Sequence, residues 1–131
     1  MELVKSNFIS ETIDAQTYWF SNSFSFPTPE KEDVHVLPAY DEFIISYTDR
    51  RASLPFENHS KAVFSNGIFR PVILVNGQVI GIWKRTIKKD EMLVETEFFE
   101  QPGESTKSSI EKAFFQFESF VEKKLEINHK L

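Results

Sequence analysis

A chain of 131 residues with 40% hydrophobic and 27% charged residues has the composition of a globular protein with its own core, which excludes extensive disorder. Cysteine is absent, which excludes a disulfide framework, a thiol nucleophile and a cysteine-based zinc site. The formal charge of −5 at pH 7 argues against a uniformly basic nucleic-acid-binding protein, and 14 phenylalanines predict a core rich in aromatic side chains.

The N-terminal third of the chain is predicted to be rich in β-structure. Residues 8–13 and 16–20 carry β-branched and aromatic side chains around a two-residue turn, which predicts two strands. Residues 24–33 contain two prolines and a charge run, so we expect a loop there. Residues 34–37 are predicted to form a short apolar strand.

A helix is predicted to follow this strand. Apolar side chains at positions 40, 43, 44 and 47 have helical spacing within Ala39–Tyr47, and both Pro38 and Asp41 suit a helix start. Residues 52–66 are compatible with either a helical turn or a loop, because their periodicity favours neither.

The clearest local signal is a β-hairpin around Asn76-Gly77, because this dipeptide accepts the two positive φ values of a type I′ turn. The predicted strands are residues 68–75 and 78–85. Counting outward from the turn pairs Ile73 with Ile80 and places Arg70 opposite Trp83.

A third strand is predicted over Met92–Phe99, after a turn at residues 89–91. Its carboxylates Glu95 and Glu97 share one face, and Val94, Thr96 and Phe98 share the other. The strand before it is apolar on both faces, which favours a barrel or a sheet covered on both sides.

Residues 105–127 are predicted to form an amphipathic helix, with Ser105 and Ser108 as candidate N-caps. Its apolar stripe consists of Ile110, Ala113, Phe114, Phe117, Phe120, Val121 and Leu125. The predicted class is therefore α+β: an antiparallel, barrel-like sheet with a short central helix and a long C-terminal amphipathic helix.

Positive charge concentrates between Arg50 and Lys89, where eight basic residues stand against Glu57 alone. This segment has a charge of +7 and the rest of the chain −12, a segregation that would suit a phosphate backbone. The alternative is a solvated hairpin whose lysines pair with Glu95 and Glu97. The candidate nucleic-acid-binding residues are Arg51, Arg70, Lys84, Arg85, Lys88 and Lys89.

Patterns typical of enzymes and metal sites are absent from the sequence. The three histidines lack ligand spacing, and there is no Gly-x-Ser-x-Gly motif or phosphate-binding loop. Asp41, Glu42 and Asp49 form an acidic set, but Asp41 is predicted to cap a helix and Asp49 to form an ion pair. We therefore assign no catalytic residue, metal or cofactor. Trp83 is expected in the core rather than against a base, with Arg70 as a cation–π partner.

Two blocks of sequence carry a family resemblance. The first is Leu37-Pro38-Ala39-Tyr40-Asp41-Glu42-Phe43 with Tyr47-x-Asp49-Arg50, and the second is Asn66–Pro71 followed by Val75–Arg85. In this order they resemble the winged-helix DNA-binding-domain-containing family, which includes bacterial DNA glycosylases acting on interstrand crosslinks and bulky alkyl adducts. The resemblance spans roughly residues 1–100.

The resemblance implies that this chain is a single domain, residues 1–131, similar to the β-rich C-terminal domain that follows tandem winged-helix modules in a longer protein. Glycosylase members carry a catalytic Gln-x-Gln motif in the winged-helix part, and the four glutamines of this chain are isolated. No catalytic residue is therefore carried over. The matching residues, with structural or DNA-contacting roles, are Tyr40, Asp41, Tyr47, Asp49, Arg50 and Trp83, joined by Arg70, Lys84 and Arg85. We expect an ion pair between Asp49 and Arg50.

The leading hypothesis is a non-catalytic domain that supports duplex DNA binding by the missing winged-helix modules through the basic hairpin. The first alternative is a domain without nucleic-acid contact that docks those modules or a second copy as a homodimer. The second is a helix-grip-like domain with a small-molecule cavity between sheet and helix. No signal peptide or membrane-spanning segment is visible, so we expect a cytoplasmic protein without a membrane partner.

Overall fold

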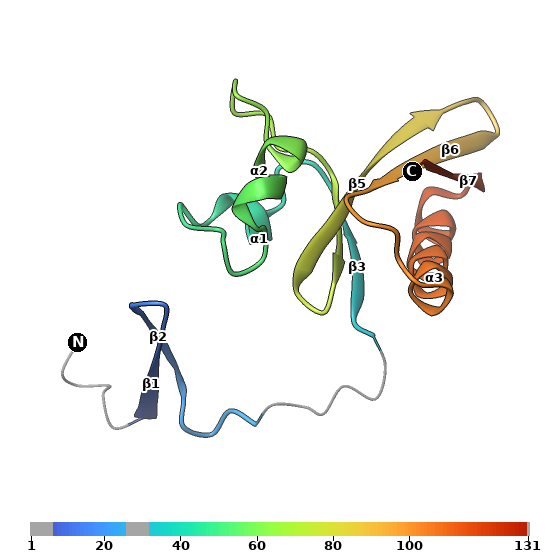
Figure 1. The fold of residues 1–131 in the computed structure, drawn as a ribbon. Helices are drawn as coiled ribbons and strands as arrows, with labels where there is room; N and C mark the ends of the chain where they lie inside the picture. The colour runs from blue at the N-terminus through green and yellow to red at the C-terminus, as the bar shows by residue number, and fades with distance from the viewer. Residues whose placement is uncertain (1–6, 26–31, 131) are drawn as a thin grey trace. The chain divides into compact units, whose positions relative to one another are not determined.

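The computed structural model describes residues 7–25 and 32–130, and the chain divides into two units, residues 1–30 and 31–131. The first unit is an antiparallel hairpin of strands β1 (Phe8–Ile13) and β2 (Gln16–Ser21) (Figure 1). Asp14 and Ala15 between them have positive φ values of 48° and 62°. The predicted pair of strands is confirmed. The predicted loop 24–33 falls partly on residues 26–31, which lie outside the described residues.

The second unit is built on an open five-stranded sheet in the order β3-β4-β5-β6-β7. The strands are β3 (Val34–Leu37), β4 (Val72–Val75), β5 (Gln78–Ile87), β6 (Glu91–Phe98) and β7 (Lys124–Lys130). Neighbours from β3 to β6 are antiparallel, and β7 runs parallel to β6. The α+β class is confirmed. The predicted barrel-like shape is wrong, because β3 and β7 remain separate edges. The predicted antiparallel pairing holds from β3 to β6 but not for β7.

Helix α3 (Glu104–Val121) connects β6 to β7 and is shorter than the predicted 105–127. It ends because Glu122 adopts a left-handed conformation with φ 54°, after which the chain extends as β7. Leu125 was predicted to continue the helical stripe, but it faces the core from a strand. The N-cap is Gly103, without a side-chain hydrogen bond, instead of Ser105 or Ser108. In the described part of the chain, no helix has the length and apolarity needed to cross a membrane.

Two short helices lie on the other side of the sheet from α3 (Figure 1). Helix α1 (Glu42–Ile45) is a single turn whose N-cap Asp41 accepts a hydrogen bond from the Phe43 N–H at 2.9 Å, so the predicted capping role is confirmed. The predicted helix 39–47 is too long, because Tyr40 has a positive φ of 59°. The undecided segment 52–66 contains helix α2 (Phe56–Ala62).

The sheet is covered on both faces, which was one of the two arrangements predicted from the apolar faces of residues 78–85. The α1–α2 side buries Ile44, Leu54, Ala62, Val63, Val72, Leu74, Val79 and Ile82. The α3 side buries Ile73, Trp83, Met92, Val94, Phe98, Ile110, Phe114 and Leu125. The Trp83 ring meets the ring of Phe114 edge-on at 5.3 Å between centroids, and its indole N–H donates to the Leu37 carbonyl oxygen at 2.9 Å. Trp83 is thus a core residue, and aromatic rings occupy the space in which a helix-grip cavity would lie.

The β4–β5 hairpin has the predicted turn. Asn76 and Gly77 have positive φ values of 51° and 78°, and Val75 pairs with Gln78. These values are those that favour Asn-Gly in a two-residue connection.

The register of this hairpin differs from the prediction beyond its first two pairs. Ile80 is an extra residue in β5, so Ile73 pairs with Gly81 instead of Ile80. Such a bulge reverses the face on which every later side chain lies, relative to a regular ladder.

The bulge changes the neighbours of Arg70. The backbone N–H of Trp83 donates to the Pro71 carbonyl oxygen at 3.1 Å. This hydrogen bond continues the shifted register by one pair and places Arg70 opposite Lys84. The predicted placement of Arg70 opposite Trp83 is therefore wrong, and so is the predicted cation–π pair. The Arg70 guanidinium lies instead over the ring of Phe64, 3.9 Å from its centroid.

Candidate nucleic-acid interface

The six predicted nucleic-acid-binding residues lie at four places on the second unit. Arg70 and Lys84 lie on the α1–α2 side of the sheet, beyond the part that these helices cover. Arg85 lies on the α3 side, where its guanidinium carbon is 5.9 Å from the Phe117 ring centroid. Lys88 and Lys89 lie with Asp90 in the exposed turn between β5 and β6, and Arg51 follows α1. The sequence segment is basic throughout, but the fold does not gather it into one patch.

A groove lies on the α1–α2 side of the sheet, between the Phe64–Arg70 segment and the β5–β7 strands. Its volume is about 390 Å³. It is lined by Phe64, Arg70, Pro71, Ile82, Trp83, Lys84, Glu95, Thr96, Glu97 and Lys130. We call this site the Arg70 groove.

The lysines of the Arg70 groove share one carboxylate. The ammonium of Lys84 is 2.8 Å from a Glu95 oxygen, and the ammonium of Lys130 forms an ion pair with the other oxygen. Hydrogen bonds from Lys130 and then from Lys84 lower the pKa of Glu95, which keeps it ionised. The predicted pairing of a hairpin lysine with Glu95 is therefore confirmed. Sequence reasoning missed Lys130, because the helix predicted over 105–127 concealed the strand that carries it.

The end of the sheet beside the β5–β6 turn carries a second group of cations. Lys123 donates to the Lys89 carbonyl oxygen at 2.6 Å, so the end of α3 brings another ammonium to the turn. Among the described residues, Arg85, Lys88 and Lys89 have no carboxylate within ion-pair distance. Their charges are therefore available to an external anion.

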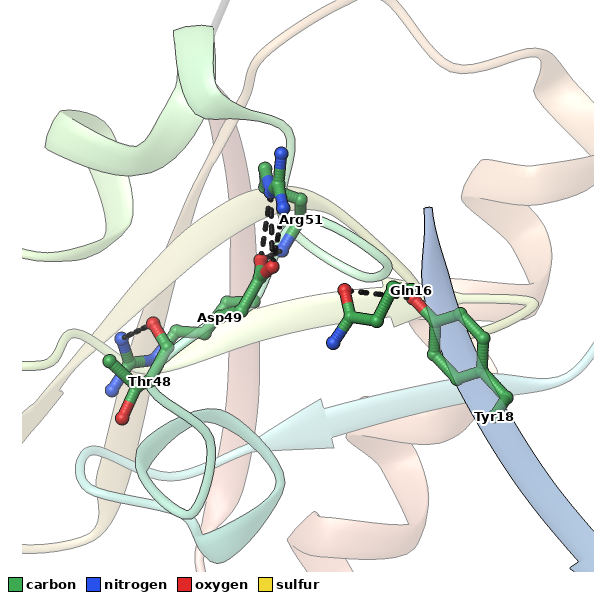
Figure 2. A network of polar contacts seen from close by, with 6 residues as sticks. Gln16, Tyr18, Thr48, Asp49 and Arg51 are labelled. Carbon is green, nitrogen blue, oxygen red and sulfur yellow. Dashed lines mark hydrogen bonds and ion pairs between the residues drawn. The ribbon is translucent and has the colours of Figure 1, made fainter. Parts of the chain in front are cut away.

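Arg51 makes its ion pair close to its own position in the chain (Figure 2). Its guanidinium contacts both oxygens of Asp49: Nη2 donates to one oxygen at 2.6 Å, and Nε lies 3.0 Å and 3.2 Å from the two oxygens. The predicted Asp49–Arg50 pair is wrong. Arg50 instead donates to the carbonyl oxygens of Ile44 and Thr48, with its guanidinium 5.0 Å from the Phe69 ring centroid. Figure 2 also shows, in the first unit, the hydroxyl of Tyr18 donating to the side chain of Gln16.

The pKa of Asp49 is a direct readout of this pair. Hydrogen bonds from the Arg51 side chain and backbone lower it to about 2. Because the folded pKa lies below the unfolded value, the pair stabilises the fold above about pH 4, and this contribution is lost as the pH falls towards 2. A carboxyl-detected NMR titration should give the lowered midpoint. Arg51→Gln should return the Asp49 pKa towards 3.8, and an unchanged midpoint in this variant would exclude Arg51 as the cause.

Most of the other family-motif residues make contacts within the fold. Asp41 caps α1, and the exposed ring of Tyr40 lies 5.9 Å from that of Phe69. Tyr47 is exposed, and Trp83 belongs to the core. Apart from Tyr47, these motif residues have packing or capping contacts that account for their residue types.

A polar cluster that sequence reasoning missed crosses the α3 side of the sheet. The hydroxyl of buried Thr96 lies 2.7 Å from His129 Nδ1, and His129 Nε2 lies 3.3 Å from a Glu111 oxygen. The cluster satisfies Thr96 and links β6, β7 and α3. Within residues 7–25 and 32–130, no three His, Asp or Glu side chains are grouped as metal ligands would be.

Comparisons with known proteins identify the family. A family model described as “DNA glycosylase AlkZ-like” matches residues 2–120. Among solved structures, the DNA glycosylase AlkZ of Streptomyces sahachiroi matches with a TM-score of 0.73 and 15% identity, over 98% of this chain and 35% of that one. At this identity the match establishes similarity of fold alone, and no curated protein sequence matches the chain. Because the family model covers most of its length, the chain belongs to the AlkZ-like DNA glycosylase family.

Proposed function

We propose that this chain is a non-catalytic, β-rich domain of a DNA-repair glycosylase, which follows winged-helix modules and supports their binding of duplex DNA. The observation that carries the proposal is the family membership of a chain in whose described part the cations at the β5–β6 turn form no ion pair. The chain is equivalent to 35% of the AlkZ structure that it matches, which is consistent with one part of a longer glycosylase.

The chemistry of the described residues supports a binding role. Phosphate contacts by lysine and arginine supply affinity that does not depend on sequence, and Arg85, Lys88 and Lys89 are exposed residues that we expect to make such contacts. A catalytic role has less support, because the sequence lacks the Gln-x-Gln motif that the family resemblance associates with catalysis.

Reversing two charges at the β5–β6 turn should weaken DNA binding. We expect Arg85→Glu/Lys88→Glu to lower the affinity of the chain for a labelled duplex by about tenfold, because two phosphate contacts become repulsive. Fluorescence anisotropy at low and at moderate salt measures the effect. The matched control is Lys61→Glu/Lys112→Glu, which changes the net charge equally at exposed lysines elsewhere. Equal affinities of the two double variants would contradict the proposed interface.

A second function, docking of a protein surface, is favoured by the β1–β2 hairpin. Its exposed side chains include Ile9, Ile13 and Trp19, of which Trp19 is 55% exposed. Two strands alone are at best marginally stable in water, so we infer that these apolar side chains pack against a protein surface. Sedimentation equilibrium of the whole chain tests whether that partner is a second copy. A monomer at high protein concentration would exclude the homodimer.

A further inference from the structure

The Arg70 groove differs from the β5–β6 turn because its lysines are already paired with a carboxylate of the chain. Two of its cations, Lys84 and Lys130, are bound to the same carboxylate, that of Glu95. The side chain of Glu95 is 15% exposed, whereas those of Lys84 and Lys130 are 65% and 53% exposed. A ligand from solvent therefore reaches the two ammonium groups more readily than it reaches the carboxylate between them.

Arg70 is the one cation of the groove lining that forms no ion pair with Glu95. Its guanidinium lies 3.9 Å from the Phe64 ring centroid, and no carboxylate is paired with it in the described part of the chain. Contact with a ring face limits the motion of a guanidinium, while its N–H groups remain directed outward in its own plane. The shifted β4–β5 register holds Arg70 opposite Lys84, so the guanidinium and an ammonium share one row across the sheet.

The charge balance of the groove fits one additional negative charge. Arg70, Lys84 and Lys130 stand against the carboxylates of Glu95 and Glu97. One phosphodiester group carries a single negative charge and two free oxygens, which a guanidinium binds in bidentate fashion. The pocket of about 390 Å³ is open at the surface of the sheet, as a site for a continuous strand must be.

We propose that the Arg70 groove binds a backbone phosphate of DNA, and that Glu95 is a resident counter-anion which this phosphate displaces from Lys84 and Lys130. The proposal rests on the proposed DNA-binding function and adds a second phosphate site to the β5–β6 turn. Glu95 then has two effects: it holds the two lysines in position in the free protein, and it lowers the affinity for DNA. Glu97 adds repulsion at the same site.

Two substitutions of opposite effect test the site in the whole chain. Arg70→Gln should weaken binding to a labelled duplex about tenfold and reduce the salt slope of the affinity by about one, because one phosphate contact is lost. Glu95→Gln should tighten binding about two- to fivefold, because the competing anion is removed from an exposed ion-pair network. A gain in affinity in a variant that still unfolds cooperatively in urea does not come from misfolding, so Glu95→Gln remains informative even if Arg70→Gln folds poorly.

Matched controls separate the groove from overall charge. Lys112→Gln on α3 removes one positive charge, as Arg70→Gln does, and should change the affinity much less. Glu104→Gln removes a carboxylate whose pKa is also lowered, in its case by Lys107 on the same helix, and should not tighten binding. Each protein is checked by urea unfolding before its affinity is measured.

Each outcome is decisive. If Arg70→Gln binds like Lys112→Gln, or Glu95→Gln binds like Glu104→Gln, the groove is not a phosphate site even where the turn variants confirm DNA binding. If the unaltered chain does not bind duplex at all, the proposed function and the groove proposal are both wrong. Inorganic phosphate should displace the duplex more effectively than chloride at equal ionic strength, because it competes for the Arg70 guanidinium, and Arg70→Gln should reduce this difference. A difference between phosphate and chloride that Arg70→Gln leaves unchanged would contradict the assignment of the phosphate site to the groove.

Discussion

Phe114→Ala is expected to lower the free energy of unfolding by about 3–5 kcal/mol, because it removes a fully buried aromatic ring from the α3 side of the core. The Phe114 ring meets that of Trp83 at 5.3 Å, and Trp83 is held from its other end by the hydrogen bond to the Leu37 carbonyl oxygen. The cavity would therefore be lined by a side chain that is not free to move into it. Urea unfolding followed by tryptophan fluorescence measures the loss.

The adjacent residue provides the control. Phe115 has the same side chain on the same helix but is 50% exposed. Phe115→Ala should change the free energy of unfolding by less than about 1 kcal/mol. Equal losses for the two variants would show that α3 does not bury the face described above.

Gly81→Ala is expected to cost about 1–3 kcal/mol, because a Cβ at this position would lie 2.7 Å from the Glu97 carbonyl oxygen. That atom belongs to the backbone of β6, and Phe98 atoms lie within 3.2 Å of the same point, so neither side of the ladder relaxes easily. The glycine is required by close approach of two strands, since its φ is not positive.

The effect of Gly81→Ala should reach beyond stability. Gly81 adjoins the extra residue Ile80, whose carbonyl oxygen accepts a hydrogen bond from the Phe99 N–H at 2.9 Å. Faster hydrogen exchange at the Phe99 amide should accompany the loss of stability. Thr86→Ala, at an exposed position of the same strand, should cost less than about 1 kcal/mol and leave this amide protected. Equal protection of Phe99 in both variants would contradict the account of the bulge.

Much of the fold could be predicted where local chemistry decides the structure. Asn76-Gly77 specifies its turn because both residues accept positive φ values. The Asp41 side chain specifies a helix start because it accepts a hydrogen bond from a backbone N–H of the first turn, that of Phe43. Alternation placed Glu95 and Thr96 on opposite faces of β6 correctly. Each of these features depends on a few neighbouring residues, so the sequence pattern was sufficient.

The features that could not be predicted depend on contacts between distant segments. The residues from Lys124 to Lys130 alternate as a strand does, yet Leu125 also continues the apolar stripe of α3, and only pairing with β6 distinguishes the two. The bulge at Ile80 likewise belongs to the pairing of β4 with β5 and leaves no local sequence signal.

The candidate interface shows the same division. The basic segment was visible in the sequence, but the bulge decides which residue of β5 lies opposite Arg70. That single inserted residue moves Arg70 from the expected neighbourhood of Trp83 to that of Lys84. Lys130 belongs to the groove because β7 pairs with β6, a pairing that the sequence did not predict. The ion-pair partner of Asp49 is Arg51 instead of the predicted Arg50. Side-chain partners two or three residues apart are decided by loop geometry, which periodicity does not describe.

We propose that this domain contacts the DNA backbone through its cations, and the salt dependence of duplex binding is the decisive test of that proposal. The logarithm of the association constant of the whole chain should fall linearly with the logarithm of salt concentration, with a slope of magnitude about three to five. This slope corresponds to about four phosphates, one bound in the Arg70 groove and one each by Arg85, Lys88 and Lys89. It should become shallower in Arg85→Glu/Lys88→Glu but not in Lys61→Glu/Lys112→Glu. A chain that binds no duplex at low salt, or a slope that both double variants leave unchanged, would contradict the claim.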